Sequence, residues 1–308
     1  MQDYHSLRRQ AILHQLPGIK LLFGPEWKSK WISIFGLFIP QIYISLNIHK
    51  LSTINQFLVT YTIGAILTQA LFLAIHELSH NLFFRDTHYN KLFSILLNLP
   101  IGIPFSISFR DYHLEHHRNL GIYGLDTDLP TAFEKKYIKG TLLKTLWLSL
   151  QIVTYSVRPM LIKSYKLKNY HYLNIFSQIA FNSFICKYYG TTPLIYYIIC
   201  DLIAGGLHPC AYHFISEHYL LSKKCKKSKQ ETFSYYGILN YITWNVGYHN
   251  EHHDFPYVPW SRLSKVRKIV KEHSTDFYEN IVSYDSWYKI FSKFIINDSV
   301  SLNDRKLN

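Results

Sequence analysis

Acidic residues and cysteines are both scarce in this 308-residue chain, and each shortage excludes a class of protein. There are 20 Asp and Glu against 33 Lys and Arg, and the net charge of +13 favours nucleic acid or an anionic membrane face as partner. No nucleic-acid motif is present and the basic residues flank apolar segments, so the membrane is favoured. The four cysteines, Cys186, Cys200, Cys210 and Cys225, form no CxxC pair, which argues against a disulfide scaffold.

The N-terminal residues lack the features of two targeting signals. Residues 1–10 contain no apolar core of a signal peptide, and Gln2 stands where N-myristoylation requires glycine. We therefore expect neither a cleaved leader nor a myristoyl anchor.

Apolar stretches, by contrast, are abundant and predict an all-α integral membrane protein with four transmembrane helices in two hairpins. The predicted spans cover residues 31–48, 55–84, 172–189 and 193–215. The second would be about 45 Å long as a helix, against a hydrocarbon core of roughly 30 Å, so its end should project into water. The fourth also overshoots. The stretch 92–109 is interrupted by prolines and a glycine, and is expected to be interfacial or re-entrant.

Lys and Arg side chains predict the orientation of these spans. Five of them precede the first span, whereas the hairpin turns hold only Lys50 and Lys187. Because cytosolic loops carry the excess of Lys and Arg, segments 1–30, 85–171 and 216–308 are expected in the cytosol, including both termini. We expect one domain, residues 1–308, with a cytosolic helical cap. The lysine-rich run Lys223–Lys229 is the one low-complexity tract, and no role is predicted for it.

Histidines form three compact motifs, HELSH, HLEHH and HNEHH, and one isolated position in SEHY. The i, i+4 spacing of HELSH places both imidazoles on one face of a helix, where they can share a metal ion. A given HxxHH pattern should arise by chance about 0.05 times in such a composition, and two occur. The nine candidate ligands are His76, His80, His113, His116, His117, His218, His249, His252 and His253.

Nine imidazoles exceed the four ligands of a structural zinc and suit two metals of higher coordination. Imidazole also binds zinc, copper and nickel, but a dinuclear all-histidine site in a membrane protein is best suited to oxygen activation by iron. His208 and His213 are the alternatives to His218 as the ninth ligand. The other histidines, His5 included, are expected to be non-ligands.

Acidic residues near these motifs are candidate partners for the second N–H of metal-bound imidazoles. They are Glu77, Asp126, Asp128, Glu217 and Asp254; simple solvation is the alternative. Trp244, Asn245 and Tyr248 are candidate contacts for a substrate head group, with core packing as the alternative. A basic amphipathic helix is expected over residues 261–273, either on an anionic membrane face or as an ordinary surface helix.

The segments around the motifs resemble those of sphingolipid Δ4-desaturases over essentially the whole chain. The most specific runs are LAIHELSHN, SFRDYHLEHHRNLG and GYHNEHHDFP. The resemblance implies an endoplasmic-reticulum enzyme that converts dihydroceramide to ceramide by O2-dependent removal of two hydrogens at carbons 4 and 5. It implies two iron ions, and electrons from NADH through cytochrome b5 and its reductase. It also implies that the eight motif histidines are ligands, with His218 in the place of the family's isolated ligand.

Other functions remain open at this point. The same site could hydroxylate carbon 4 and form phytoceramide, could do both reactions, or could desaturate a simple fatty acyl chain. From a different class, a zinc-dependent membrane hydrolase or a metal transporter would also use histidines. Asp201, an acidic residue inside the predicted fourth span, is what a transporter would use. Two irons per chain would favour the oxygenase, whereas a single zinc would exclude it.

Overall fold

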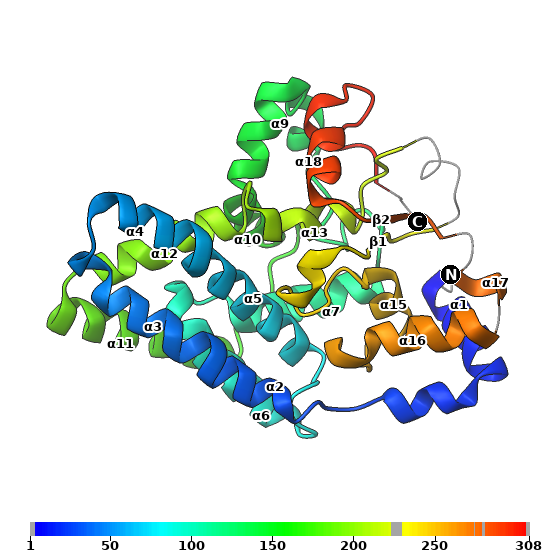
Figure 1. Cartoon of the computed structure of the whole chain (residues 1–308), viewed down its shortest axis with the longest axis horizontal. Helices are drawn as coiled ribbons and strands as arrows, with labels where there is room; N and C mark the ends of the chain where they lie inside the picture. Colours follow the sequence, from blue (N-terminus) through cyan, green and yellow to red (C-terminus); the bar gives the residue numbers. More distant parts are fainter. Residues whose placement is uncertain (1–3, 223–229, 274, 279–280, 306–308) are drawn as a thin grey trace. The chain divides into compact units, whose positions relative to one another are not determined.

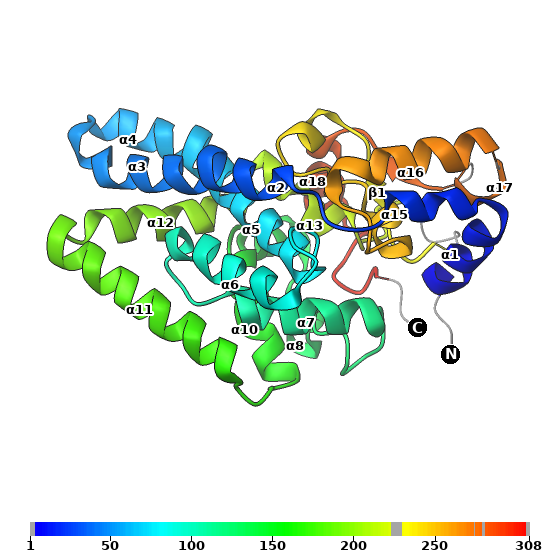
Figure 2. The same cartoon turned by 90° about the horizontal axis from the view of Figure 1, so that it is seen from below.

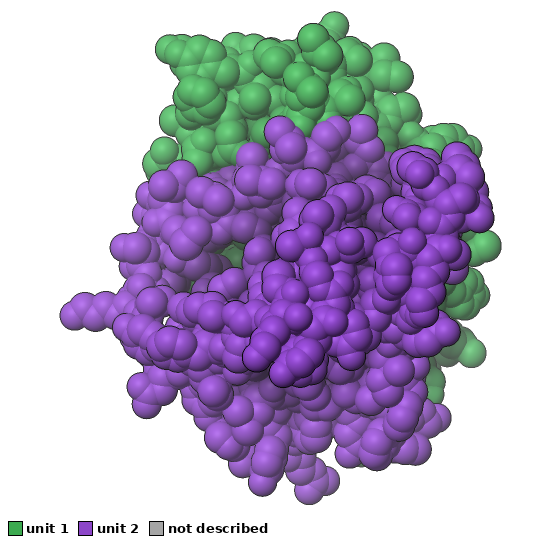
Figure 3. All heavy atoms as spheres, turned by 90° about the vertical axis from the view of Figure 1, so that its left-hand side faces the viewer, with its two compact units in different colours: residues 1–25, 115–147, 212–308 green, residues 26–114, 148–211 purple. Residues whose placement is uncertain are grey.

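The computed structural model describes residues 4–222, 230–273, 275–278 and 281–305. Cys225 and the run Lys223–Lys229 lie outside these residues. The chain divides into unit 1, residues 1–25, 115–147 and 212–308, and unit 2, residues 26–114 and 148–211 (Figure 3). Within the described residues the only sheet has two strands, and the all-α prediction is confirmed.

Two helices of unit 2 match the first predicted hairpin. One runs over Lys28–Lys50, 23 residues, through α2 (Lys28–Trp31), a π-helical segment (Ile32–Phe38) and α3 (Ile39–Asn47). The other runs over Thr53–Ser79, 27 residues, through α4 (Thr53–Val59), a second π-helical segment (Thr60–Gly64) and α5 (Ala65–Ser79). Both are long and apolar enough to cross a membrane.

The second of these helices ends at Ser79, so its predicted extension to residue 84 is wrong. The backbone turns at Asn81, where φ is 62°. Arg110 stabilises this end: its Nη1 donates to the Leu78 carbonyl at 2.8 Å and its Nη2 to Asn81 Oδ1 at 3.0 Å. A helix C-terminus leaves carbonyls without intrahelical partners, and the guanidinium satisfies one of them.

The rest of unit 2 is formed by shorter helices. These are α6 (Thr87–Asn98), the first part of α7 (Ser106–Arg118), α10 (Gln151–Ile162), α11 (Asn169–Tyr189) and α12 (Thr192–Ala204). The pair α6 and α7 is bent by 116°, as a broken span or re-entrant segment would be. The predicted fourth span is not one continuous helix, because α12 ends at Ala204 and a new helical segment begins at Pro209.

Among the described residues, two helices qualify as membrane spans, or up to four if each bent pair counts as one. The predicted third span corresponds to α11, which is not among them. Its inner side carries buried polar residues, among them Asn174 and Gln178. The apolar helices suggest a membrane-embedded protein; the four-span arrangement stays a prediction.

The helices of unit 2 pack around α5 and α12 (Figures 1 and 2). α5 packs against α6 and α12, and α12 also contacts α3 and α11. A few buried polar contacts join them, such as Gln41 Nε2 to Thr68 Oγ1 at 2.9 Å. Large apolar side chains face outward and are exposed, as expected where lipid is the solvent. They include Phe35, Tyr43, Phe57, Phe176 and Ile195.

The start of α7, which carries the second histidine motif, is set by Asn98 at the end of α6. Asn98 Oδ1 accepts from the backbone N–H groups of Phe105 and Ser106 at 2.9 and 2.6 Å. Its Nδ2 donates to Gln178 Oε1 at 2.7 Å. Gly102 permits the tight turn between the two helices because its φ is 82°. These contacts determine the direction in which α7 leaves the turn.

Unit 1 contains both chain ends and many short elements. Its helices are α1 (Tyr4–Gln15), α8 (Ala132–Tyr137), most of α9 (Gly140–Ser149), α13 (His213–Ser216), α15 (His249–Asp254), α16 (Trp260–His273), α17 (Thr275–Tyr278) and α18 (Trp287–Ile296). Its two parallel strands are β1 (Ser234–Tyr235) and β2 (Ser283–Tyr284).

The core of unit 1 lies where α1, α15 and α16 meet (Figures 1 and 2). The apolar side of α16, with Leu263, Val266 and Val270, packs in one cluster with Ile12 and Phe255. The apolar face of the predicted basic amphipathic helix is therefore covered by protein. This favours an ordinary surface helix over one that lies on a membrane.

Gly247 lets the third histidine motif approach strand β1, and its replacement by Ala should destabilise unit 1. A Cβ there would lie 2.4 Å from the Tyr235 carbonyl oxygen and 2.5 Å from Asn240 Oδ1. We expect Gly247→Ala to cost about 1–3 kcal/mol of unfolding free energy, measured by denaturant unfolding in detergent. Gly18→Ala is the control, because a Cβ at Gly18 has nothing within 4 Å. Equal stability of both variants would contradict this prediction.

Candidate metal centre

Three candidate ligands come together within unit 2. His76 lies in α5, His80 follows the end of that helix, and His113 lies in α7. Their ligand nitrogens lie within 4.8 Å of one another, and the Nε2 atoms of His80 and His113 are 2.9 Å apart. Glu77 is buried, with its carboxylate 4.0 Å from His76 Nδ1. The HELSH motif is therefore completed by a histidine 33 residues further along the chain.

The other six candidate ligands come together within unit 1. Nitrogens of His116, His218 and His253 lie within 4.8 Å of one another. The Nε2 atoms of His117 and His252 are 3.2 Å apart, as are those of His249 and His218. These rings come from α7, from the residues after α13 and from α15, so three separate segments supply them.

Asp126 accepts the second N–H of His116, as the sequence predicted for this carboxylate. Its Oδ1 lies 2.8 Å from His116 Nδ1, and its Oδ2 accepts from the Gly121 N–H at 2.8 Å. Burial alone would lower the pKa of His116, but the Asp126 and Asp128 carboxylates outweigh burial and raise it. Asp128 lies further away, at 3.6 Å from the same nitrogen. With Nδ1 held in this way, Nε2 of His116 faces the other imidazoles.

Glu217 lies beside His249 and His213 at ion-pair distance. Its Oε1 lies 3.3 Å from His249 Nδ1 and 3.2 Å from His213 Nδ1. His213 thus supports the carboxylate and lies outside the imidazole groups described above. His208, the other alternative ligand, packs its ring against Tyr61 and accepts from the Cys210 N–H at 3.2 Å. Among these three histidines, the structure places His218 alone among the grouped imidazoles.

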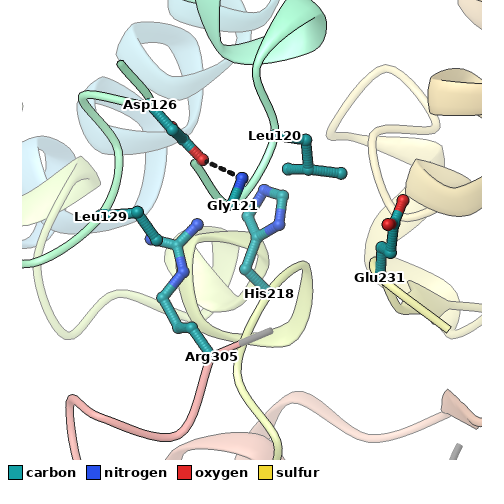
Figure 4. A pocket seen from close by; sticks show the side chains of 7 residues that line it. All are labelled: Leu120, Gly121, Asp126, Leu129, His218, Glu231 and Arg305. Carbon is teal, nitrogen blue, oxygen red and sulfur yellow. Dashed lines mark hydrogen bonds between the residues drawn. The ribbon is translucent and has the colours of Figure 1, made fainter. Parts of the chain in front are cut away.

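A small cavity adjoins His218 in unit 1 (Figure 4). It has room for about one water molecule and is lined by Asp126, Glu231 and Arg305, among others. Arg305, near the C-terminal end, donates to the Asp128 carbonyl oxygen and sits over the Tyr219 ring. Burial alone would raise the pKa of Asp126. His116 and, to a smaller extent, Arg305 outweigh burial and lower that pKa below its usual value. Sequence reasoning missed Arg305 because no local pattern marks it.

The predicted head-group contacts make protein contacts in the structure. The Trp244 ring packs against Trp260 at 4.9 Å, and Asn245 Nδ2 donates to the Trp260 carbonyl at 3.0 Å. Tyr248 packs against Tyr236. Trp244 and Asn245 both have positive φ, 50° and 52°, so they form a tight left-handed turn ahead of the third motif. Their contact with a substrate stays a prediction.

The residues present fit a metal ion. Two nitrogens bound at right angles to one ion, at about 2.1 Å each, lie about 3 Å apart, which matches the pairs found here. Burial lowers the pKa of His218, His252 and His253, in the case of His252 to about 3, so these rings are neutral as ligands must be. Among the described residues, His253 Nε2 is buried without a hydrogen-bond partner. A cation would satisfy it.

Comparison with known proteins shows what this arrangement is similar to. The pattern that describes the fatty acid desaturase family matches residues 53–287. A sphingolipid delta(4)-desaturase of Candida albicans is 42% identical over 310 residues, covering 96% of this chain and 82% of the relative. A protein of Oryza sativa subsp. japonica named sphingolipid delta(4)-desaturase DES1-like is 42% identical over 296 residues, covering 96% and 87%. A relative in Caenorhabditis elegans, 41% identical over 298 residues (96% and 80%), has a name that joins delta(4)-desaturase to C4-monooxygenase.

Asp126 should contribute to metal affinity through His116. Loss of a carboxylate that orients a metal-bound imidazole typically weakens metal binding 10–100-fold, so we expect about that loss in Asp126→Asn. Competition with a chelator, using the purified full chain, measures it. Asp111→Asn is the matched control, because Asp111 in α7 pairs with Lys168, whose side chain is 70% exposed. Unchanged affinity in Asp126→Asn would contradict the assigned role.

Proposed function

The chain belongs to the fatty acid desaturase family, within it to the sphingolipid delta(4)-desaturases, and we propose that it desaturates dihydroceramide at two histidine-bound irons. It is an oxidoreductase. One hydrogen leaves carbon 4 and one leaves carbon 5, while O2 takes up these, two electrons and two protons to give two water molecules. The observation that carries the proposal is the grouping of all nine candidate histidines into close sets with paired nitrogens within their own unit.

The proposed ligands are three histidines of unit 2 and six of unit 1. In unit 2 they are His76, His80 and His113. In unit 1 they are His116, His117, His218, His249, His252 and His253. Such a set supports two ions better than one zinc, which takes four ligands, or three and a water. When bound, the irons supply O2 activation and hydrogen abstraction from the unreactive acyl chain.

The chain's own residues prepare this chemistry. Asp126 accepts at the Nδ1 atom of His116, and the Glu217 carboxylate lies 3.3 Å from the Nδ1 atom of His249, so that Nε2 of each ring is left for the metal. Burial of these rings excludes water from the reacting atoms. The carboxylates of Glu77 and Asp128 lie 4.0 and 3.6 Å from the Nδ1 atoms of His76 and His116, and both are proposed as electrostatic neighbours of these rings.

The proposal extends to substrate, electron donor and location. The exposed apolar helices of unit 2 support a lipid substrate that reaches the site from the bilayer. We propose that electrons arrive from NADH through cytochrome b5 and its reductase, and that the enzyme lies in the endoplasmic reticulum with both termini cytosolic. We also propose that residues 1–308 act as a single domain.

Alternative functions are less well supported. Relatives named as delta(4)-desaturases over nearly the full chain disfavour a C4-hydroxylase and a simple fatty acyl desaturase. A zinc hydrolase or a transporter does not account for six grouped imidazoles in unit 1 in addition to three in unit 2.

Expression in a yeast strain that makes no Δ4-unsaturated sphingoid bases tests the function directly. We expect the 4,5-unsaturated product, detected by mass spectrometry of hydrolysed sphingolipids, with excess 4-hydroxy product measured in the same samples. The proposal fails if metallated protein accumulates and neither product forms; a predominant 4-hydroxy product would assign the hydroxylase instead.

Replacement of one ligand should abolish the product. His253→Ala removes a buried nitrogen that we assign to iron, so no 4,5-unsaturated base should form although the protein is present. His14→Ala, at an exposed position of α1, is the control and should retain wild-type product. Activity that survives His253→Ala would remove this residue from the ligand set.

A further inference from the structure

The third histidine motif lies on a helix too short to hold its own orientation. α15 has 6 residues, His249–Asp254, whereas isolated helices below about 12 residues are marginal in water. Its histidines at 249, 252 and 253 share one face, because residues three and four apart lie together on a helix. The opposite face carries Asn250, Glu251 and Asp254, all buried. The orientation of the histidine face must therefore come from contacts made by this second face.

Arg8 of α1 makes the most contacts with that second face. Its Nε donates to Asp254 Oδ2 at 2.8 Å, and its Nη2 donates to Asp254 Oδ1 at 2.8 Å and to Asn250 Oδ1 at 2.7 Å. The guanidinium thus binds one carboxylate through two nitrogens and also reaches a residue one turn earlier. Two parallel hydrogen bonds from one guanidinium hold the carboxylate in a defined orientation as well as a defined position, which the single ammonium group of a lysine does not.

Two more side chains complete the environment of Asp254. His5, one turn before Arg8 on α1, lies with Nδ1 at 2.7 Å from Asp254 Oδ1, and its ring packs against His253 at 5.1 Å between centroids. Tyr278 donates to Asp254 Oδ2 at 2.8 Å. His5 Nε2 lies 3.2 Å from Thr232 Oγ1, so both nitrogens of this ring contact protein partners. His5 is therefore a neighbour of the ligand group, as expected for a non-ligand.

The ion pair between Arg8 and Asp254 is shielded from water. Asp254 is fully buried and Arg8 is nearly so. Removing one partner of a buried ion pair leaves the other charge without compensation and is strongly destabilising. Loss of the Arg8 contacts would therefore loosen the face of α15 that carries Asp254 and Asn250.

We propose that Arg8 is a positioning residue of the metal centre: acting through Asp254 and Asn250, it orients α15 and determines how firmly His249, His252 and His253 hold iron. This inference rests on the proposed function only in taking the bound metal as iron. It makes the first helix of the chain, which lies 246 residues from Asp254 in sequence, part of the site.

The test is the rate at which the purified, iron-loaded full chain in detergent loses iron to a chromogenic chelator. We expect Arg8→Gln to lose iron about 10–100-fold faster than wild type, with Arg8→Lys in between. Arg9→Gln is the matched control, because this variant removes the same charge from the same helix. Arg9 donates to the Asp254 backbone carbonyl at 3.4 Å and to Ser6 Oγ at 3.2 Å, and neither contact is to the Asp254 carboxylate. This variant should lose iron at the wild-type rate.

A double-mutant cycle shows whether Arg8 acts through Asp254. In an Asp254→Asn background, Arg8→Gln should change the rate by a much smaller factor, because its main partner no longer carries charge. Helix content by circular dichroism confirms that each variant is folded; if Arg8→Gln is not, the cycle is run with Arg8→Lys. Equal rates for Arg8→Gln and Arg9→Gln, or the same factor in both backgrounds, would overturn the inference. Wild-type protein that holds iron but makes no sphingolipid product would contradict the proposed function alone.

Discussion

Imidazole nitrogens that face one another at 2.9–3.2 Å, in buried or part-buried pairs, are the constraint on which the surrounding structure depends. Two neutral rings in such a pair cannot both present lone pairs to each other without a proton or a cation between them. A metal ion removes the conflict at every pair. Burial also lowers the pKa of His252 and His253, which keeps these two rings in the neutral form that can bind a metal ion.

Outside the imidazoles of unit 1 lies a layer of carboxylates, and outside the carboxylates lies a layer of cations. Asp126 holds His116 and is itself held by the Gly121 N–H, with Arg305 nearby. Asp254, behind His253, is held by Arg8, and Glu251 is held by Arg267 at 3.1 Å. Alternation of sign lets several charged groups be buried together, because each is neutralised by the next.

Short helices carry several of the grouped histidines of unit 1. They depend on contacts from segments near both ends of the chain. α13 has 4 residues and α15 has 6, so neither is stable without its tertiary contacts. α1 contributes Arg8 and His5, while the C-terminal segment pairs Arg305 with Tyr219 in an isolated bridge. In unit 2, α5 carries His76 on its last turn and His80 follows directly after its last residue, where Arg110 binds the Leu78 carbonyl.

Local patterns in the sequence were sufficient for the all-α class, the first two apolar helices and the family, because helix periodicity and motif spacing act over a few residues. They also singled out the nine histidines that the structure groups, whose role as ligands stays a prediction. They were also sufficient for Asp126, which lies 10 residues from His116. Helix ends and outer contacts were decided only by the tertiary structure. α5 stops at Ser79 where Arg110, 32 residues from Leu78, binds a carbonyl, and the predicted fourth span breaks after Ala204. Arg8 reaches Asp254 across 246 residues, and no local periodicity encodes a pairing over that distance.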